Sequence, residues 1–199
     1  MTLSDALLTL KIIVCGEGGV GKTTLISDFT GVPVTIGETP ATIGINFATR
    51  TLTTSSRIIN LQIWDFGGQD QFRFFLPDFC KGALGCVVVF DLTRYTTFEK
   101  IEDWSRVIEE NVKGIPRILV GNKADKIESR VVDQSVIDSL VAKEKFRAYF
   151  ETSAKTGLNI VEPFAILTLV ILKRLDTMSL DIEACADIPL SQPQNKNIG

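Results

Sequence analysis

Short apolar runs alternate along this chain with segments whose apolar residues recur at helical spacing. The runs predict six β-strands, at residues 11–15, 45–53, 57–64, 85–92, 117–121 and 147–151. The segments between them predict helices at residues 22–30, 97–112, 132–143 and 160–175. Runs that are apolar throughout are typical of parallel strands covered on both faces. The pattern therefore predicts an α/β fold, a mostly parallel six-stranded sheet with helices on both faces.

Two of the strands are expected to form a hairpin. The strands at 45–53 and 57–64 are separated only by a short turn at 54–56, which predicts one antiparallel edge strand. Residues 31–44 and 65–77 show no apolar periodicity and are predicted to be long loops, the second with a helical turn beyond it. In the second predicted helix, the core positions are expected at Phe98, Ile101, Trp104 or Val107, and Ile108.

One domain is expected to account for most of the 199 residues. We expect it at residues 10–176, after an N-terminal extension of residues 1–9. Residues 177–199 are rich in Ser, Asp, Pro, Gln and Asn without periodicity, which is typical of a disordered tail. The longest apolar runs, 82–90 and 163–172, fall short of the roughly 20 residues that a membrane span needs.

Composition narrows the possible chemistry. A net charge of −3 argues against a nucleic-acid partner bound by bulk positive charge, and we expect none. The absence of histidine excludes histidine triads and histidine metal sites, so a metal ion would need oxygen or thiolate ligands. The four cysteines show no C-x-x-C spacing, and Cys15 and Cys86 lie in apolar runs where burial is expected. A reducing, cytoplasmic setting fits best.

The most specific motif lies between the first strand and the first helix. Gly16, Gly21, Lys22 and Thr23 satisfy the G-x-x-x-x-G-K-[ST] pattern of a phosphate-binding loop. The four glycines of the loop permit positive φ and close backbone approach, so that successive N–H groups can surround an anion. The helix N-terminus that follows also favours a phosphate. The nucleotide-binding residues predicted here are Glu17, Gly18, Gly19, Val20, Gly21, Lys22, Thr23 and Thr24.

Two side chains of this loop carry specific chemistry. Lys22 would place its charge on the β- and γ-phosphate oxygens, and the Thr23 hydroxyl would be a hard oxygen ligand for Mg²⁺. The alternative is a Gly-rich turn before a helix with Lys22 merely solvated. The flanking strand and helix favour the phosphate loop.

A second motif, Asp65-Phe66-Gly67-Gly68-Gln69, follows the second hairpin strand. In a phosphate-loop enzyme, a carboxylate at the tip of a neighbouring strand holds Mg²⁺, usually through water, and a Gly-containing loop reaches the γ-phosphate. We assign these roles to Asp65 and to the Gly68 N–H, and Gln69 would orient the attacking water. The predicted catalytic residues are thus Gln69, Lys22 and Gly68. Alternatively, the motif is only a turn that ends the strand.

Thr42, in the loop at 31–44, is a candidate third metal ligand. Its hydroxyl could complete Mg²⁺ coordination only when a γ-phosphate is present, so the loop would be ordered by triphosphate and released after hydrolysis. Taken alone, Thr42 is one threonine among many. The predicted metal ligands are Thr23, Thr42 and Asp65.

The motif Asn122-Lys123-Ala124-Asp125 follows a buried strand directly and would decide which base binds. The Asp125 carboxylate can accept two hydrogen bonds from N1–H and the 2-amino group of guanine, whereas adenine offers no such pair. Asn122 would tie neighbouring loops together, and Lys123 would lay its apolar stem along the base. The alternative is a common four-residue turn. Contacts to the guanine carbonyl are predicted from the backbone N–H groups of Ser153, Ala154 and Lys155.

Together these motifs resemble those of the Ras-like small GTPase family over about residues 10–175, and most of all its Rab type. Residues 42–47 (TIGINF) are similar to the Rab T-I-G-V-D-F stretch, and residues 79–83 (FCKGA) to Y-Y-R-G-A. The double glycine of W-D-F-G-G-Q is similar to Arf-like proteins, Gα subunits and Roc domains. The resemblance implies a phosphate-loop NTPase G domain with switch I at residues 31–44 and switch II at residues 66–77.

The resemblance also implies ligands and partners. It implies GTP or GDP with Mg²⁺, and a GTPase-activating protein, an exchange factor and effectors at the switches. No aromatic residue lies between Thr30 and Phe47, where relatives commonly stack a ring on guanine, so we expect faster nucleotide exchange. The second residue is Thr2 and the chain ends at Gly199 without C-a-a-X or Cys-Cys, so we expect no direct lipid anchor. We expect a cytoplasmic monomer that reaches membranes only through partners.

The favoured hypothesis is a GTP-hydrolysing molecular switch. No arginine is evidently placed as a catalytic finger in cis, so we expect slow intrinsic turnover, on the order of 10⁻⁴ to 10⁻³ per second. Three alternatives stay open: an adaptor that hardly hydrolyses GTP, an ATP-dependent phosphate-loop kinase, against which Asp125 argues, and a Roc-type domain of a larger protein.

Several aromatic residues gather in and after the predicted switch II. Some are expected in the core, and an exposed remainder would form a partner surface that appears in one nucleotide state. These residues are Phe66, Phe72, Phe74, Phe75 and Phe79.

Overall fold

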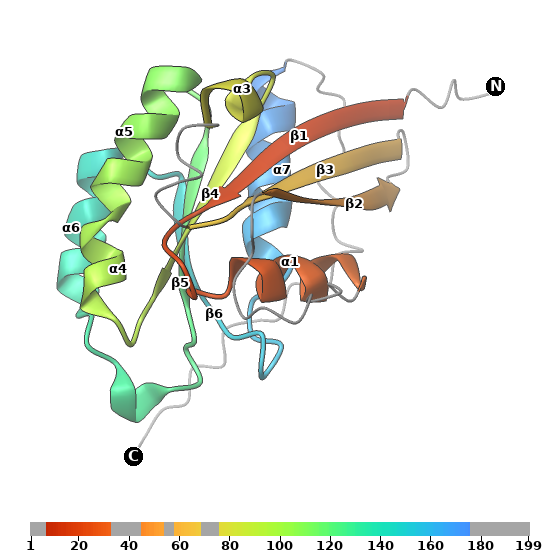
Figure 1. Ribbon diagram of the computed structural model, residues 1–199. Coiled ribbons are helices and arrows are strands. Elements are labelled where there is room, and N and C mark those ends of the chain that lie inside the picture. The colour runs from red at the N-terminus through yellow and green to blue at the C-terminus, as the bar shows by residue number, and fades with distance from the viewer. Residues whose placement is uncertain (1–6, 33–44, 54–57, 69–75, 176–199) are drawn as a thin grey trace.

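A computed structural model of the chain describes residues 7–32, 45–53, 58–68 and 76–175. Its six strands form one sheet in the order β2-β3-β1-β4-β5-β6 (Figure 1). All neighbouring strands are parallel except β2 and β3, which confirms the predicted antiparallel edge. The strands are β1 (Leu7–Cys15), β2 (Ile45–Thr53), β3 (Ile58–Phe66), β4 (Gly85–Asp91), β5 (Arg117–Asn122) and β6 (Ala148–Thr152).

The central strands are buried because helices cover both faces of the sheet. All seven residues of β4 are buried, whereas β3 alternates between buried and half-buried positions, as expected nearer an edge. β1 begins at Leu7, earlier than its apolar run predicts, because residues 7–9 pair with β3 although the Leu7 side chain is 64% exposed. Residues 7–9 therefore belong to the sheet and not to an N-terminal extension.

Among the described elements, α1 and α7 pack on one face of the sheet, and α4, α5 and α6 pack on the other together with the short helix α3 (Figure 1). α1 (Lys22–Thr30) and α7 (Glu162–Arg174) share one face, where the rings of Phe29 and Phe164 stack with centroids 4.1 Å apart. The opposite face carries α4 (Tyr95–Glu99), α5 (Ile101–Asn111) and α6 (Gln134–Glu144). A short helix α3 (Leu76–Cys80) and a 3₁₀ turn (Ile127–Ser129) complete the described helical elements.

The helix predicted at 97–112 is in fact two helices, which meet at Lys100. Around the break, the buried residues recur every three positions, which is a shorter repeat than the 3.6 residues per turn of an α-helix. These residues are Phe98, Ile101 and Trp104. Trp104 is 1% exposed and occupies the core position, whereas Val107 is half-buried.

The burial predicted for Cys15 and Cys86 is confirmed, and their sulfur atoms lie 3.6 Å apart. Phe66 is buried and Phe79 is half-buried, while the other three phenylalanines of the predicted cluster lie outside the described residues. So do the hairpin turn, nearly all of switch I, most of switch II and the C-terminal tail. Among the helices that the structure describes, none is long and apolar enough to cross a membrane.

The parallel arrangement brings the C-terminal ends of β1, β3, β4, β5 and β6 to the same edge of the sheet (Figure 1). In open α/β sheets, ligands bind at this edge. Each predicted motif in the described residues follows one of these strands, so the fold gathers motifs that are far apart in the sequence.

Candidate nucleotide-binding site

The phosphate loop turns between β1 and α1, and every carbonyl from Gly16 to Val20 accepts a hydrogen bond from a side chain. The donors are Lys22 Nζ to the Gly16 and Glu17 oxygens (2.8 and 2.9 Å), Arg94 Nη2 to Gly18 (2.7 Å), Lys123 Nζ to Gly19 (3.0 Å) and Asn122 Nδ2 to Val20 (2.8 Å). Cationic donors offset the repulsion that these carbonyl oxygens would exert on a phosphate.

Lys22 is the buried cation of the loop, with only 5% of its surface exposed. Burial lowers the pKa of its ammonium group, and the neighbouring Asp65 carboxylate opposes that shift. Two of its three N–H groups bind loop carbonyls, and among the described residues the third has no partner. The ammonium is therefore held in place with one donor left for an anion.

Asp65 and Thr23 meet beside the phosphate loop, as their predicted roles require. Thr23 Oγ1 donates to Asp65 Oδ2 at 2.5 Å, and Asp65 is 2% exposed. Burial raises the pKa of Asp65, while hydrogen bonds from Thr23 and Asn46 and the charge of Lys22 lower it. In the described part of the chain, Asp65 Oδ1 is buried without a hydrogen-bond partner. A hydroxyl and a carboxylate with a free oxygen are ligands that Mg²⁺ prefers, so the residues fit this ion.

Gly68 lies directly against the phosphate loop. A Cβ atom at this position would be 2.2 Å from the Glu17 carbonyl carbon and 2.3 Å from the Gly18 nitrogen. Only glycine permits that approach without moving one of the two backbones. The structure therefore brings the start of switch II to the loop, as the motif predicts.

Gly18 differs from the other glycines of the loop. Gly16, Gly19 and Gly21 have positive φ, but Gly18 does not, and a Cβ there would meet no atom within 4 Å among the described residues. Three of the four loop glycines therefore use the positive φ that glycine permits, and Gly18 does not. Two further predicted residues, Thr42 and Gln69, lie outside the described ranges, and their roles stay predictions.

Asn122 connects the phosphate loop to the base-reading motif, which confirms the tie predicted for it. Its amide donates to Val20, and its Oδ1 accepts a hydrogen bond from Thr152 Oγ1 at 3.1 Å. Gly21, with φ of 97°, allows this contact, because a Cβ there would lie 2.3 Å from Asn122 Nδ2.

Asp125 is oriented by a residue of the last predicted motif. Ser153 Oγ donates to Asp125 Oδ1 at 2.7 Å, and this hydrogen bond is the main reason that the pKa of Asp125 is lowered. The Ser153 amide, however, donates to the Leu158 carbonyl at 3.1 Å. In this structure the Ser153 amide is thus engaged with the backbone, and the contacts predicted from Ser153, Ala154 and Lys155 to guanine stay predictions.

Sequence reasoning missed three residues that shape the site. Asp91, fully buried at the end of β4, accepts from Lys123 Nζ at 2.7 Å and from Arg94 Nε at 3.0 Å. Burial tends to raise the pKa of Asp91, but hydrogen bonds from Lys123 and Thr93 outweigh it and the pKa is lowered.

Trp104 Nε1 donates to Glu17 Oε1 at 3.0 Å. Asp91 could have been predicted as a site residue, because it lies at the C-terminal end of a buried parallel strand.

A row of aromatic rings runs along the edge strands beside the two switches. The ring centroids of Phe47 and Trp64 are 5.3 Å apart, and those of Trp64 and Phe79 are 5.7 Å apart. Phe47 is 53% exposed, and Trp64 Nε1 has no partner within the described residues. The row is thus an aromatic surface that ends at Phe47 and Phe79, which follow the predicted switch segments closely in the sequence.

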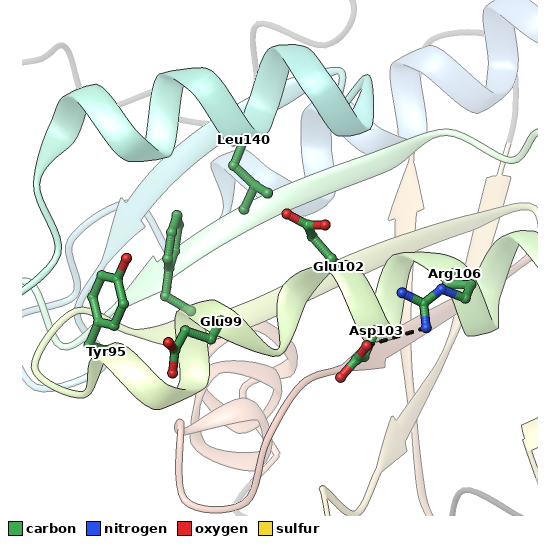
Figure 2. A pocket seen from close by; sticks show the side chains of 7 residues that line it. Tyr95, Glu99, Glu102, Asp103, Arg106 and Leu140 are labelled. Carbon is green, nitrogen blue, oxygen red and sulfur yellow. Dashed lines mark ion pairs between the residues drawn. The ribbon is translucent and has the colours of Figure 1, made fainter.

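A separate pocket of about 370 Å³ opens between helices, where Glu102 and Leu140 point toward each other (Figure 2). It contains none of the predicted site residues, so it is not part of the nucleotide site. Its lining residues are Tyr95, Phe98, Glu99, Glu102, Asp103, Arg106 and Leu140.

Comparisons with known proteins show the family of the chain. The family model described as "Ras family" matches residues 11–173. Ras-related protein Rab-13 of Bos taurus is 38% identical over 163 residues, which cover 81% of this chain and 79% of that protein. Ras-related protein Rab11B of Nicotiana tabacum is 35% identical over 190 residues, which cover 94% of this chain and 85% of that protein. The chain therefore belongs to the Ras family and is a small GTPase of the Rab-like type.

Proposed function

We propose that this switch, which binds GTP and hydrolyses it to GDP and phosphate, holds its nucleotide across the loops that follow β1, β5 and β6. The observation that carries the proposal is the direct tie between the phosphate loop and the base-reading motif. Asn122 binds Val20, and Lys123 binds Gly19, so a nucleotide spanning the two motifs meets groups already fixed relative to one another. Such preorganisation lowers the ordering cost of binding.

The base end of the site would select guanine. Asp125, ionised and oriented by Ser153, would accept from N1–H and the 2-amino group. The Lys123 stem would lie along the base, and the amides of Ala154 and Lys155 would donate to the guanine carbonyl. This division of roles favours a guanine-specific switch over an ATP-dependent kinase.

The phosphate end would bind charge and position water. The Lys22 ammonium would neutralise charge on the β- and γ-phosphates, and the Gly68 amide would donate to the γ-phosphate. Gln69 would orient a water molecule that attacks the γ-phosphorus, while the bond to the β-phosphate oxygen breaks and GDP leaves. Arg94, the arginine that contacts the loop, is held on a carbonyl, so slow intrinsic turnover is still expected.

Thr23 and Asp65 would hold Mg²⁺, with Thr42 joining in the triphosphate state. When bound, the ion would neutralise developing charge on the phosphates. The buried Oδ1 of Asp65, which has no partner in the part of the chain that the structure describes, supports this assignment.

Thr23→Ala should raise the Mg²⁺ concentration needed to retain GDP by about tenfold to one hundredfold, since it removes one ligand and the hydrogen bond that orients Asp65. The measurement is the release rate of a fluorescent GDP analogue across a Mg²⁺ series buffered with EDTA. Thr96→Ala, which changes an exposed threonine of α4, is the matched control. An unchanged Mg²⁺ dependence would remove Thr23 from the metal site.

Gln69→Leu should slow single-turnover GTP hydrolysis on the order of tenfold, the effect of about 1.4 kcal/mol lost from transition-state stabilisation. Wild-type protein should turn over at roughly 10⁻⁴ to 10⁻³ per second without a partner. Gln134→Leu, at the exposed start of α6, is the control. If wild type is no faster than Gln69→Leu, the proposed water-orienting role fails.

The same experiment can follow the aromatic row, which we propose as the surface read by regulators and effectors. The fluorescence emission of Trp64 should change at the same rate as phosphate is released. The Trp64 ring contacts Phe47 and Phe79, which follow the predicted switches in the sequence. Trp64→Phe assigns the signal, since Trp104 is the second tryptophan. Emission that stays constant through hydrolysis would exclude this row as the reporting surface.

A further inference from the structure

Arg94 joins two parts of the site that no motif connects. It lies three residues after the end of β4 and directly precedes α4 at the N-cap position, yet its side chain makes no hydrogen bond that caps this helix. Its Nε donates to Asp91 Oδ2 at 3.0 Å, and its Nη2 donates to the Gly18 carbonyl at 2.7 Å. The guanidinium therefore bridges a buried carboxylate and the outer turn of the phosphate loop.

The Asp91 carboxylate makes this bridge rigid. Asp91 is 0% exposed and is also held by Lys123 and by the Thr93 amide and hydroxyl. Because Asp91 is fixed by these bonds, Arg94 is anchored at one end and reaches the loop with the other. A planar guanidinium suits this task, since its donors are fixed relative to one another.

A hydrogen bond to the Gly18 carbonyl also affects the next amide group of the loop. In a trans peptide, the C=O of one residue and the N–H of the next point in opposite directions. Fixing the direction of the Gly18 carbonyl therefore also fixes the direction of the Gly19 N–H, which points away from Arg94 on the other side of the peptide plane. This peptide group joins two glycines. Backbone sterics therefore restrict its orientation less than that of any other peptide group in the loop.

Neighbouring peptide planes are held in the same way by residues of the base-reading motif. Lys123 holds the Gly19 carbonyl and Asn122 holds the Val20 carbonyl. Arg94 is the donor that completes this series at Gly18. Burial is the main reason that the pKa of Lys22 is lowered, and the charge of Arg94 adds a smaller contribution in the same direction.

We propose that Arg94 is a positioning residue for the phosphate loop, which orients the Gly19 amide toward the diphosphate and slows nucleotide release. This inference rests on the assignment of residues 17–24 as the phosphate site. It supplies a restraint on the phosphates in a chain that has no aromatic residue between Thr30 and Phe47 to stack on the base.

The test is release of a fluorescent GDP analogue from full-length Arg94→Ala. We expect release about tenfold faster than from wild type, near the low end for a lost hydrogen bond from a charged donor, because the Arg94 side chain is 44% exposed. Affinity for GMP, measured by competition, should change less than about twofold, since GMP has no β-phosphate. The variant should fold, because Asp91 keeps its bond to Lys123.

Arg106→Ala is the matched control, since it removes an exposed arginine that pairs with Asp103 three residues away in α5. It should leave GDP release unchanged. Equal losses for GDP and GMP would overturn the proposal, because they indicate general destabilisation. Unchanged GDP release would also overturn it, whether or not hydrolysis slows. If wild-type protein itself fails to bind GDP, the phosphate-site assignment fails instead.

Discussion

Asp125→Asn is expected to lower the affinity for GTP by roughly 10⁴-fold and to create affinity for XTP. A site built to hydrogen-bond a substrate group discriminates by about that factor when the pairing is lost. Asparagine would present an N–H to the 2-amino group of guanine, donor against donor, whereas xanthine carries an oxygen there. The asparagine Oδ1 can still accept from Ser153 Oγ, so the local structure should survive.

The affinity for GTP is measured by competition against a fluorescent guanine nucleotide. The affinity for XTP is measured directly by calorimetry. Asp138→Asn, an exposed substitution on α6, should change neither affinity. Loss of GTP binding without gain of XTP binding would remove Asp125 from its assigned role as the guanine reader.

Lys22→Met is expected to weaken GDP and GTP binding by roughly 10²- to 10⁴-fold, the range for removing one partner of a buried charge interaction. Methionine keeps the apolar stem but loses the ammonium, so the Gly16 and Glu17 carbonyls lose their donor and the phosphates lose a cation. The pKa of Asp65 should rise further, because Lys22 is one of the groups that lower it.

Release of fluorescent GDP measures the effect, and circular dichroism confirms that the variant is folded. Lys143→Ala provides the control, because this exposed lysine pairs with Glu102 across two surface helices, away from the phosphate loop. A Lys22→Met protein that retains GDP within tenfold of wild type would contradict the proposed role of the ammonium.

Motifs with fixed local spacing could be predicted well from the sequence. The phosphate loop, Asp65 and Asn122 each follow a strand whose apolar run is easy to identify, and parallel strands bring such positions to one edge. The same reasoning predicted the six strands and the antiparallel pair, because burial on both faces leaves a strong pattern.

What the sequence did not reveal depends on contacts between distant segments. Arg94 reaches Gly18 across 76 positions, and Trp104 reaches Glu17 across 87, so no local pattern announces either bond. The Ser153 amide pairs with Leu158 in a short bridge that a motif of three residues does not contain. The strand at residues 7–9 forms because β3 lies beside it, although Thr9 and Lys11 interrupt the apolar run.

The buried oxygen of Asp65 has a consequence for the lifetime of the folded chain. Within the described ranges this oxygen is a buried acceptor without a partner, and such a group costs about 1 to 3 kcal/mol, a large share of the roughly 5 to 15 kcal/mol by which a domain is stable. A ligand that binds only the folded state adds RT ln(1 + [L]/Kd) to that stability. The folded fraction of this protein, and with it its exposure to proteolysis, must therefore follow the supply of guanine nucleotide around it.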